Sequence, residues 1–151
     1  MQWLLIPFVA LAGVLNAVQA GSNQTLNQRL DHPFVSAMLV YAGGVLATAA
    51  AWVVARLVNG KGLPSASAFA GVPWWGFIGG TMGAVYVLAM LTAAAKLGAG
   101  VFTAATVTAA VITSLVLDHF GWMGFEAHPA GLGRIAGGLL MVAGLCCIAK
   151  S

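Results

Sequence analysis

Polar side chains inside otherwise apolar stretches are the residues of this sequence whose types and spacing could do chemistry. Asn16, Gln19, Asn23 and Asn27 follow one another at i, i+3, i+7 and i+11, so their amides share one face of a single helix that continues to about Gln28. An amide in hydrocarbon must find a partner or line water. The stripe predicts either a substrate pathway or hydrogen bonds between helices, and both interpretations stay open.

Hydroxyl groups form a second, weaker pattern. Thr103, Thr106 and Thr113 share a helical face, although threonines in membrane helices often bond only to their own backbone. Tyr41 and Tyr86 lie within two further apolar stretches, where a phenol needs a partner or a cavity. The predicted substrate-binding set is therefore Asn16, Gln19, Asn23, Tyr41, Tyr86, Thr106 and Thr113.

Other kinds of chemistry find little support in the sequence. Because no nucleophile–base pair falls within an apolar stretch, we predict no catalytic residues and no enzyme. The adjacent Cys146 and Cys147 stand in an apolar run and are interpreted as packing residues. Four metal-type ligands share one loop but lack a recognised ligand spacing, which favours a solvated loop and predicts neither metal nor cofactor: Asp118, His119, Glu126 and His128.

The composition defines the class of protein that must position these groups. Hydrophobic residues make up 61% of the 151 residues, charged residues only 6%, and the mean hydropathy is +0.98. A soluble domain of this size could not hide so much apolar surface. The net charge of +3 comes from six Lys and Arg residues scattered singly, which excludes a nucleic-acid-binding patch. We predict an all-α, multi-pass integral membrane protein with a single membrane domain.

Five apolar stretches are long enough to cross a bilayer. The second begins at Pro33 with Asp31 as its cap and closes at Arg56, and residues 57–72 form a loop rich in Gly, Ser and Pro. We expect the third to begin with Pro73 at its first helical position. The predicted spans are residues 2–22, 33–55, 73–95, 97–117 and 130–149.

The first and last spans have alternatives. The first could be a cleaved signal peptide ending at Ala20, which would leave four spans, but it has no Lys or Arg near its start and Asn16 interrupts its apolar core.

The fourth span ends at Leu117. Only 15 residues separate Arg134 from Lys150, so we expect the fifth helix to start near Pro129 and Arg134 to snorkel towards water.

The third span carries the strongest packing signal and organises the chain. Trp74 and Trp75 after Pro73 suit the headgroup region, and the following small residues allow another helix to approach closely. The fifth span is similarly rich in glycine, which also allows close helix packing. The predicted helix-packing residues are Gly79, Gly80, Gly83 and Gly137.

The Lys and Arg residues are distributed evenly between the two sides of a five-span protein. Three lie on the side of the N-terminus and three on the other, so the bias that normally sets orientation is absent: Arg56, Lys61 and Arg134 against Arg29, Lys96 and Lys150. Chance could produce this balance with six charges. We favour insertion in both orientations, which would allow an antiparallel homodimer.

Two blocks of this sequence together resemble a family of small five-span inner-membrane exporters in the drug/metabolite transporter superfamily. The resemblance runs from about Val14 to the C-terminus and rests on these residues: Asn16, Gln19, Asn23 and Asn27 before Pro33, Pro73-Trp74-Trp75 with Gly79-Gly80, Gly83 and Tyr86, and Asp118-His119-Phe120-Gly121. Members occur as dual-topology proteins, paired genes or fused doubles, which implies an antiparallel dimer. The family's usual Gly-Gln is replaced here by Ala109-Ala110.

The resulting hypothesis is a transporter of the bacterial inner membrane. Two antiparallel copies would enclose a site of amides, hydroxyls and aromatic rings near the midplane and work by alternating access. Its partners would be a second copy, the lipid bilayer and a neutral, zwitterionic or weakly cationic small molecule. The alternative is a non-transporting accessory subunit that pairs with a homologous partner.

Overall fold

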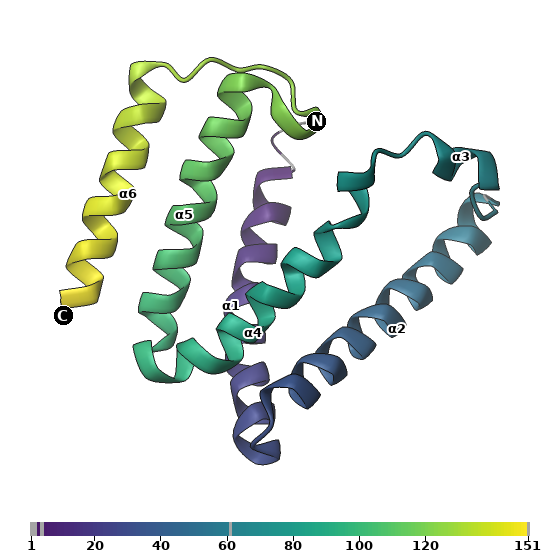
Figure 1. Ribbon diagram of the computed structural model, residues 1–151, viewed down its shortest axis with the longest axis horizontal. Coiled ribbons are helices and arrows are strands. Elements are labelled where there is room, and N and C mark those ends of the chain that lie inside the picture. Colours follow the sequence, from purple (N-terminus) through teal and green to yellow (C-terminus); the bar gives the residue numbers. More distant parts are fainter. Residues whose placement is uncertain (1–2, 4, 61, 151) are drawn as a thin grey trace. The chain divides into compact units, whose positions relative to one another are not determined.

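The computed structural model describes residue 3, residues 5–60 and residues 62–150, and these residues form an all-helical fold (Figure 1). The elements are α1 (Leu5–Leu30), α2 (Pro33–Asn59), α3 (Ala66–Ala70), the 3-10 turn η2 (Trp74–Phe77), α4 (Gly79–Leu97), α5 (Ala99–Phe120), the turn η3 (Trp122–Gly124) and α6 (Leu132–Lys150). Five helical segments of 19 to 27 residues are long and apolar enough to cross a membrane, with η2 and α4 counted as one. The predicted all-α class and five spans are confirmed.

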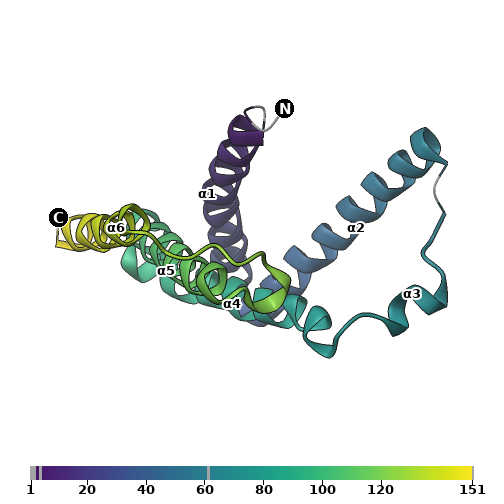
Figure 2. The same ribbon diagram turned by 90° about the horizontal axis from the view of Figure 1, so that it is seen from above.

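The chain divides into two compact units, which are described separately below. The first contains residues 1–17 and 93–151, and the second contains residues 18–92. Within the first unit, α5 and α6 run side by side in both views (Figure 1, Figure 2). The second unit holds the end of α1, all of α2 and α3, and most of α4.

The first helix continues well past its apolar run, as the spacing of its amides predicts. α1 extends without interruption to Leu30, and Ala20, the last residue of the alternative signal peptide, is buried in its middle. Trp3 precedes the helix in a short helical turn, and residues 2 and 4 of the predicted span lie outside the described residues.

The N-cap of α2 lies one residue later in the chain than predicted. His32, not Asp31, is the N-cap: its backbone is extended at φ −148° and ψ 92°, and its Nδ1 accepts a hydrogen bond of 3.5 Å from the Val35 N–H. Asp31 has a left-handed backbone with φ 50°, which ends α1 instead. Pro33 holds the first helical position as predicted, because its missing N–H would have no acceptor there.

The connection between α2 and α4 is shorter and more helical than its composition indicates. α2 continues three residues beyond Arg56 to Asn59 and ends at Gly60, a left-handed C-cap with φ 66°. Residues 66–70 form α3. Lys61 lies outside the described residues. The prediction that residues 57–72 form a loop throughout is therefore wrong for residues 57–59 and for residues 66–70.

The third span begins in two steps. Pro73 has ψ 151° and is the extended N-cap of η2, so the prediction that it occupies the first helical position is wrong. Only from Gly79 does the backbone become α-helical. Gly76, inside η2, raises the entropic cost of an α-helix before Gly79.

The boundaries of α5 and α6 also differ from the prediction. The Asp118-His119-Phe120 segment forms the last turn of α5, and Gly121 caps it with φ 62°, so the helix does not end at Leu117. α6 begins at Leu132 rather than near Pro129, because the preceding connection is bound to the end of α5 by the His128 N–H to Asp118 O bond of 2.7 Å. Its 19 residues correspond to about 28 Å, close to the bilayer core.

Candidate functional site

Two amides of the α1 stripe lie in a contact among three helices of the second unit. The Asn23 side chain, 6% exposed, donates a hydrogen bond of 3.4 Å to Met90 Sδ on α4. The Asn27 Nδ2 donates to the Leu91 carbonyl oxygen at 3.1 Å, and its Oδ1 accepts from the Ser36 hydroxyl on α2 at 3.3 Å. We call these five residues the polar junction. It joins α1, α2 and α4 through side-chain hydrogen bonds.

The polar junction lies beside the apolar core of the second unit. Ala37 of α2 packs with Val87 and Leu91 of α4, and Tyr86 is half-buried against this cluster. Residues 83, 87, 90 and 91 of α4 recur at helical spacing, so they form one stripe that faces its neighbours. The junction's amides are thus shielded from the surroundings, as buried amides that bond between helices must be.

Tyr41 of α2 meets α4 at a glycine. A Cβ added to Gly83 would lie 2.7 Å from the Tyr41 hydroxyl oxygen, closer than real Cβ atoms approach any atom. Only glycine therefore lets the phenol occupy this place. The Tyr41 side chain remains 36% exposed, so one part of the ring packs against α4 and another faces outward.

The remaining predicted site residues lie in different surroundings. In the second unit, Gln19 is exposed. In the first unit, Asn16 is half-buried, and Thr113 is exposed. The Thr106 hydroxyl bonds back to the Phe102 and Thr103 carbonyl oxygens at 2.9 and 3.1 Å, as the local interpretation predicts. Asn23, Tyr41 and Tyr86 thus lie in the same unit, each at a contact with α4 or within it, and the structure does not gather the whole set.

The predicted packing glycines divide into two groups. Gly83 contacts Tyr41, as described above. A Cβ at Gly79, Gly80 or Gly137 would meet no atom within 4 Å among the described residues of the chain. Among the described residues of its own unit, none of these three glycines meets another helix closely, and their role at a seam with a second copy stays a prediction.

Asn23 is the one member of the polar junction in the predicted substrate-binding set, and two members whose side chains take part, Ser36 and Met90, were not singled out by the sequence at all. Ser36 is fully buried, and Met90 is 1% exposed. A serine three residues after Pro33, at the start of an apolar helix, is a weak signal for a buried contact. No sequence pattern distinguishes Met90 from the other apolar residues of α4, because its sulfur accepts a hydrogen bond only through the placement of Asn23.

The metal-type ligands at the end of α5 take part in local bonds. His119 Nδ1 accepts from the Ala130 N–H at 3.1 Å, His128 Nδ1 lies 2.9 Å from the Glu126 carbonyl oxygen, and the Asp118 carboxylate lies 3.8 Å from Arg134. Among residues 5–60 and 62–150, no three His, Cys, Asp or Glu side chains are grouped as metal ligands would be. Cys146 and Cys147 are exposed thiols on α6.

Five helices that are long and apolar enough to cross a bilayer indicate a multi-pass membrane protein. A family model with the description "Putative inner membrane exporter, YdcZ" matches residues 4–147. The chain belongs to this family, and it is a multi-pass protein of the inner membrane. The resemblance found in the sequence is thereby confirmed, and the family is one of transporters rather than an enzyme class. Searches of the curated proteins and of the solved structures found no match to this chain.

Proposed function

We propose that this protein exports a small molecule across the inner membrane as an antiparallel homodimer that works by alternating access. The match of residues 4–147 to an inner-membrane exporter family carries the proposal. Five spans leave the two termini on opposite sides, so two copies of opposite orientation would form an inverted pair of the kind that alternating access uses. Because both halves of this inverted pair are copies of the same chain, one gene is enough to encode it.

The positions of the cations support insertion in both orientations. The described Lys and Arg residues lie within a turn of a helix end, where side chains reach the membrane surface: Arg29, Arg56, Lys96, Arg134 and Lys150. None of them lies deep in a span, so each counts towards orientation. With Lys61 the two sides carry three each.

The environments of the polar side chains suggest a division of roles. Asn23 is committed to Met90, so we assign it to helix contact, in support of the α1–α4 arrangement. Gln19 and Tyr41 are exposed and Asn16 is half-buried, and we assign these three residues to the substrate pathway. A lining of amides and phenols without charges suits neutral, zwitterionic or weakly cationic substrates better than strong anions.

A ligand screen on purified protein tests the transport proposal. Compounds from amine and metabolite libraries that raise the melting temperature would then be tested as radiolabelled substrates in proteoliposomes. We expect uptake or efflux by wild type and reduced binding by Asn16→Ala, with the dimer fraction unchanged. If ligands bind but are never moved, and a homologous partner protein is required for any activity, the accessory-subunit alternative replaces this proposal.

Tagging tests the antiparallel arrangement separately from transport. A tag fused after Ser151 should be accessible from both sides of the membrane in one culture. Two lysines added to the connection between α2 and α4 should bias insertion towards one orientation and lower activity, and an oppositely biased copy should restore it. Detection of the wild-type tag on one side only contradicts dual insertion.

A further inference from the structure

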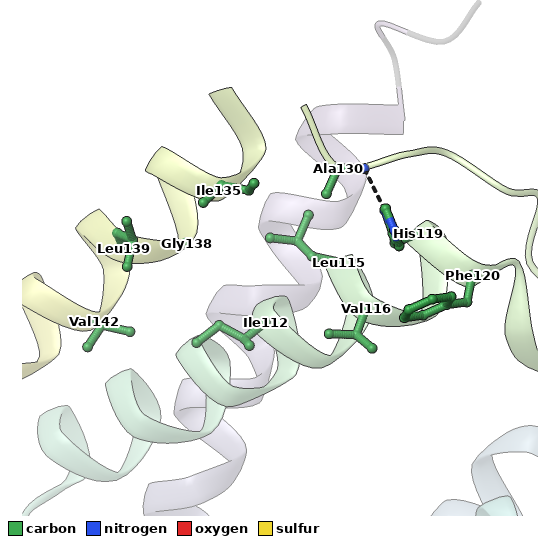
Figure 3. Close-up of a pocket in the computed structure, with 10 residues that line it drawn as sticks. All are labelled: Ile112, Leu115, Val116, His119, Phe120, Ala130, Ile135, Gly138, Leu139 and Val142. Carbon is green, nitrogen blue, oxygen red and sulfur yellow. Dashed lines mark hydrogen bonds between the residues drawn. The ribbon is translucent and has the colours of Figure 1, made fainter. Parts of the chain in front are cut away.

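An apolar groove of about 400 Å³ runs between α5 and α6 in the first unit (Figure 3). Gly138 forms part of its floor: a Cβ there would lie 3.6 Å from Leu115 Cδ1, at ordinary contact distance, so a longer side chain would fill the space. Two further groups of side chains form its walls: Ile112, Leu115 and Val116 from α5, and Ile135, Leu139 and Val142 from α6.

The groove runs from the membrane interface into the hydrocarbon. From Ile112 to His119, and from Ile135 to Val142, each helix advances seven residues, or about 10 Å. The outer end lies beside the helix termini, where Phe120 and Trp122 stack at a centroid distance of 4.9 Å. Aromatic residues next to a span end are typical of the headgroup level. In a bilayer such a concave surface is filled by an acyl chain unless protein covers it.

A hydrogen-bond donor stands at the outer end of this groove. His119 lines it, and its Nδ1 accepts a hydrogen bond from the Ala130 N–H at 3.1 Å (Figure 3). An accepting Nδ1 carries no proton, so the proton of the neutral imidazole is on Nε2. The ring therefore presents an N–H donor where the groove meets the headgroup region.

Opposite charges lie next to this donor. The Arg134 guanidinium, 43% exposed, donates to the His128 carbonyl oxygen at 3.1 Å and lies 3.8 Å from the Asp118 carboxylate, which is 33% exposed. An ion pair this long and this accessible leaves both groups able to bind a further charge. Glu126 adds a second carboxylate to the same connection. Asp118 and Arg134 do not line the groove themselves, but each directly precedes a residue that does, His119 and Ile135. The ion pair therefore lies beside the outer end of the groove and adds a cation for a phosphate and a carboxylate for an ammonium.

We propose that this groove binds one zwitterionic aminophospholipid of the phosphatidylethanolamine type. One acyl chain lies between α5 and α6, the phosphate accepts from His119 Nε2–H and the Arg134 guanidinium, and the ammonium donates to the Asp118 carboxylate. The acyl chain contributes packing, but lipid tails are as apolar as the groove. The headgroup therefore determines which phospholipid is preferred. Phosphatidylcholine lacks an N–H donor for the carboxylate, and phosphatidylglycerol lacks the cation altogether.

Native mass spectrometry of the detergent-purified protein, titrated with each of the three lipids, measures the proposed preference. Phosphatidylethanolamine should bind about two- to fivefold more tightly than phosphatidylcholine or phosphatidylglycerol, the range that exposed charge pairs allow. Asp118→Asn should shift the preference to phosphatidylglycerol, because Arg134 then lacks a counter-charge. Lys150→Gln, a charge change at the other end of α6, is the matched control and should leave the lipid preference unchanged.

The groove itself is tested by two neighbouring substitutions. Leu139→Trp places an indole in the groove, whereas Leu140→Trp makes the same change at an exposed residue outside the groove lining. Lipid binding should fall severalfold in the first variant and persist in the second. Wild-type protein incubated with a lipid whose acyl chain is photoactivatable should form cross-links at Ile112, Leu139 or Val142. Because this experiment uses no variant, its result does not depend on whether a variant folds.

Three results would overturn the proposal. The first is equal binding of the three lipids, and the second is equal binding by both tryptophan variants. The third is a cross-link from the groove to a second copy of the chain instead of the lipid, which would identify the groove as a protein interface. None of these results bears on transport, so the lipid site and the proposed function fail or stand separately.

Discussion

Replacing Gly83 by alanine should introduce a steric conflict with one identifiable atom. The new Cβ would lie 2.7 Å from the Tyr41 hydroxyl oxygen, about 0.7 Å short of the 3.4 Å at which ordinary van der Waals contact begins. The hydroxyl is at the far end of a partly exposed side chain, so the ring can rotate away. A rotation of this kind costs about 0.5–1.5 kcal/mol in rotamer energy.

The alanine also changes the helix itself, and a control is needed to separate the two effects. Glycine to alanine in a helix interior stabilises by roughly 0.5–1 kcal/mol. Gly80→Ala should show this gain alone, because a Cβ there meets nothing within 4 Å in the described chain. Gly83→Ala should be about 0.5–1.5 kcal/mol less stable than Gly80→Ala. If Gly80→Ala is itself destabilising in the dimer, Gly80 lies at the predicted seam.

A double-mutant cycle with Tyr41→Phe identifies the atom responsible. Phenylalanine lacks the hydroxyl and leaves the ring's Cζ position 3.8 Å from the new Cβ, an ordinary contact. Free energies of unfolding would be measured by denaturant titration in mixed micelles for wild type, both single variants and the double variant. The double variant should recover the stability lost through the conflict, with a coupling energy of about 0.5–1.5 kcal/mol.

Additive effects of the two substitutions, within about 0.5 kcal/mol, would refute the reasoning. So would a Gly83→Ala variant as stable as Gly80→Ala. Either result means that α2 and α4 do not approach each other at Tyr41 and Gly83. The aromatic part of the proposed pathway would then lose its structural support.

Three further outcomes are expected. Asn23→Ala should lower the unfolding free energy by about 0.5–2 kcal/mol through loss of the bond to Met90, whereas Asn16→Ala should lower ligand binding more than stability when both are measured on one preparation. Gly121→Ala should cost about 1–2 kcal/mol of unfolding free energy, because its φ of 62° is left-handed, while Gly131→Ala in the same connection should be near neutral. Gly137→Leu should leave the secondary structure unchanged by circular dichroism and lower the dimer fraction in detergent if this glycine lies at the seam.

The predicted amide stripe shows how far the sequence reaches at the candidate site. Helical spacing places Asn16, Gln19, Asn23 and Asn27 on one face, but it cannot tell which neighbour lies opposite each one. The structure separates them: Asn23 and Asn27 bond across to other helices, and Gln19 is exposed. The interpretation as hydrogen bonds between helices therefore holds for Asn23 and Asn27, and the pathway interpretation stays a proposal for Asn16 and Gln19.

The sequence by itself determined the membrane class, the five spans and the helix-end positions of the cations. These are local properties, because the length of an apolar run is measured against a bilayer of fixed thickness. The N-cap of α2 is His32, one residue after the predicted Asp31, because the left-handed backbone of Asp31 ends α1. Only the tertiary structure decided that Ser36 and Met90 belong to the polar junction, that Tyr41 lies against Gly83, and that α5 and α6 leave a groove below His119. Each of these depends on residues far apart in the chain, whose contacts are set by helix packing and not by any periodicity in one helix.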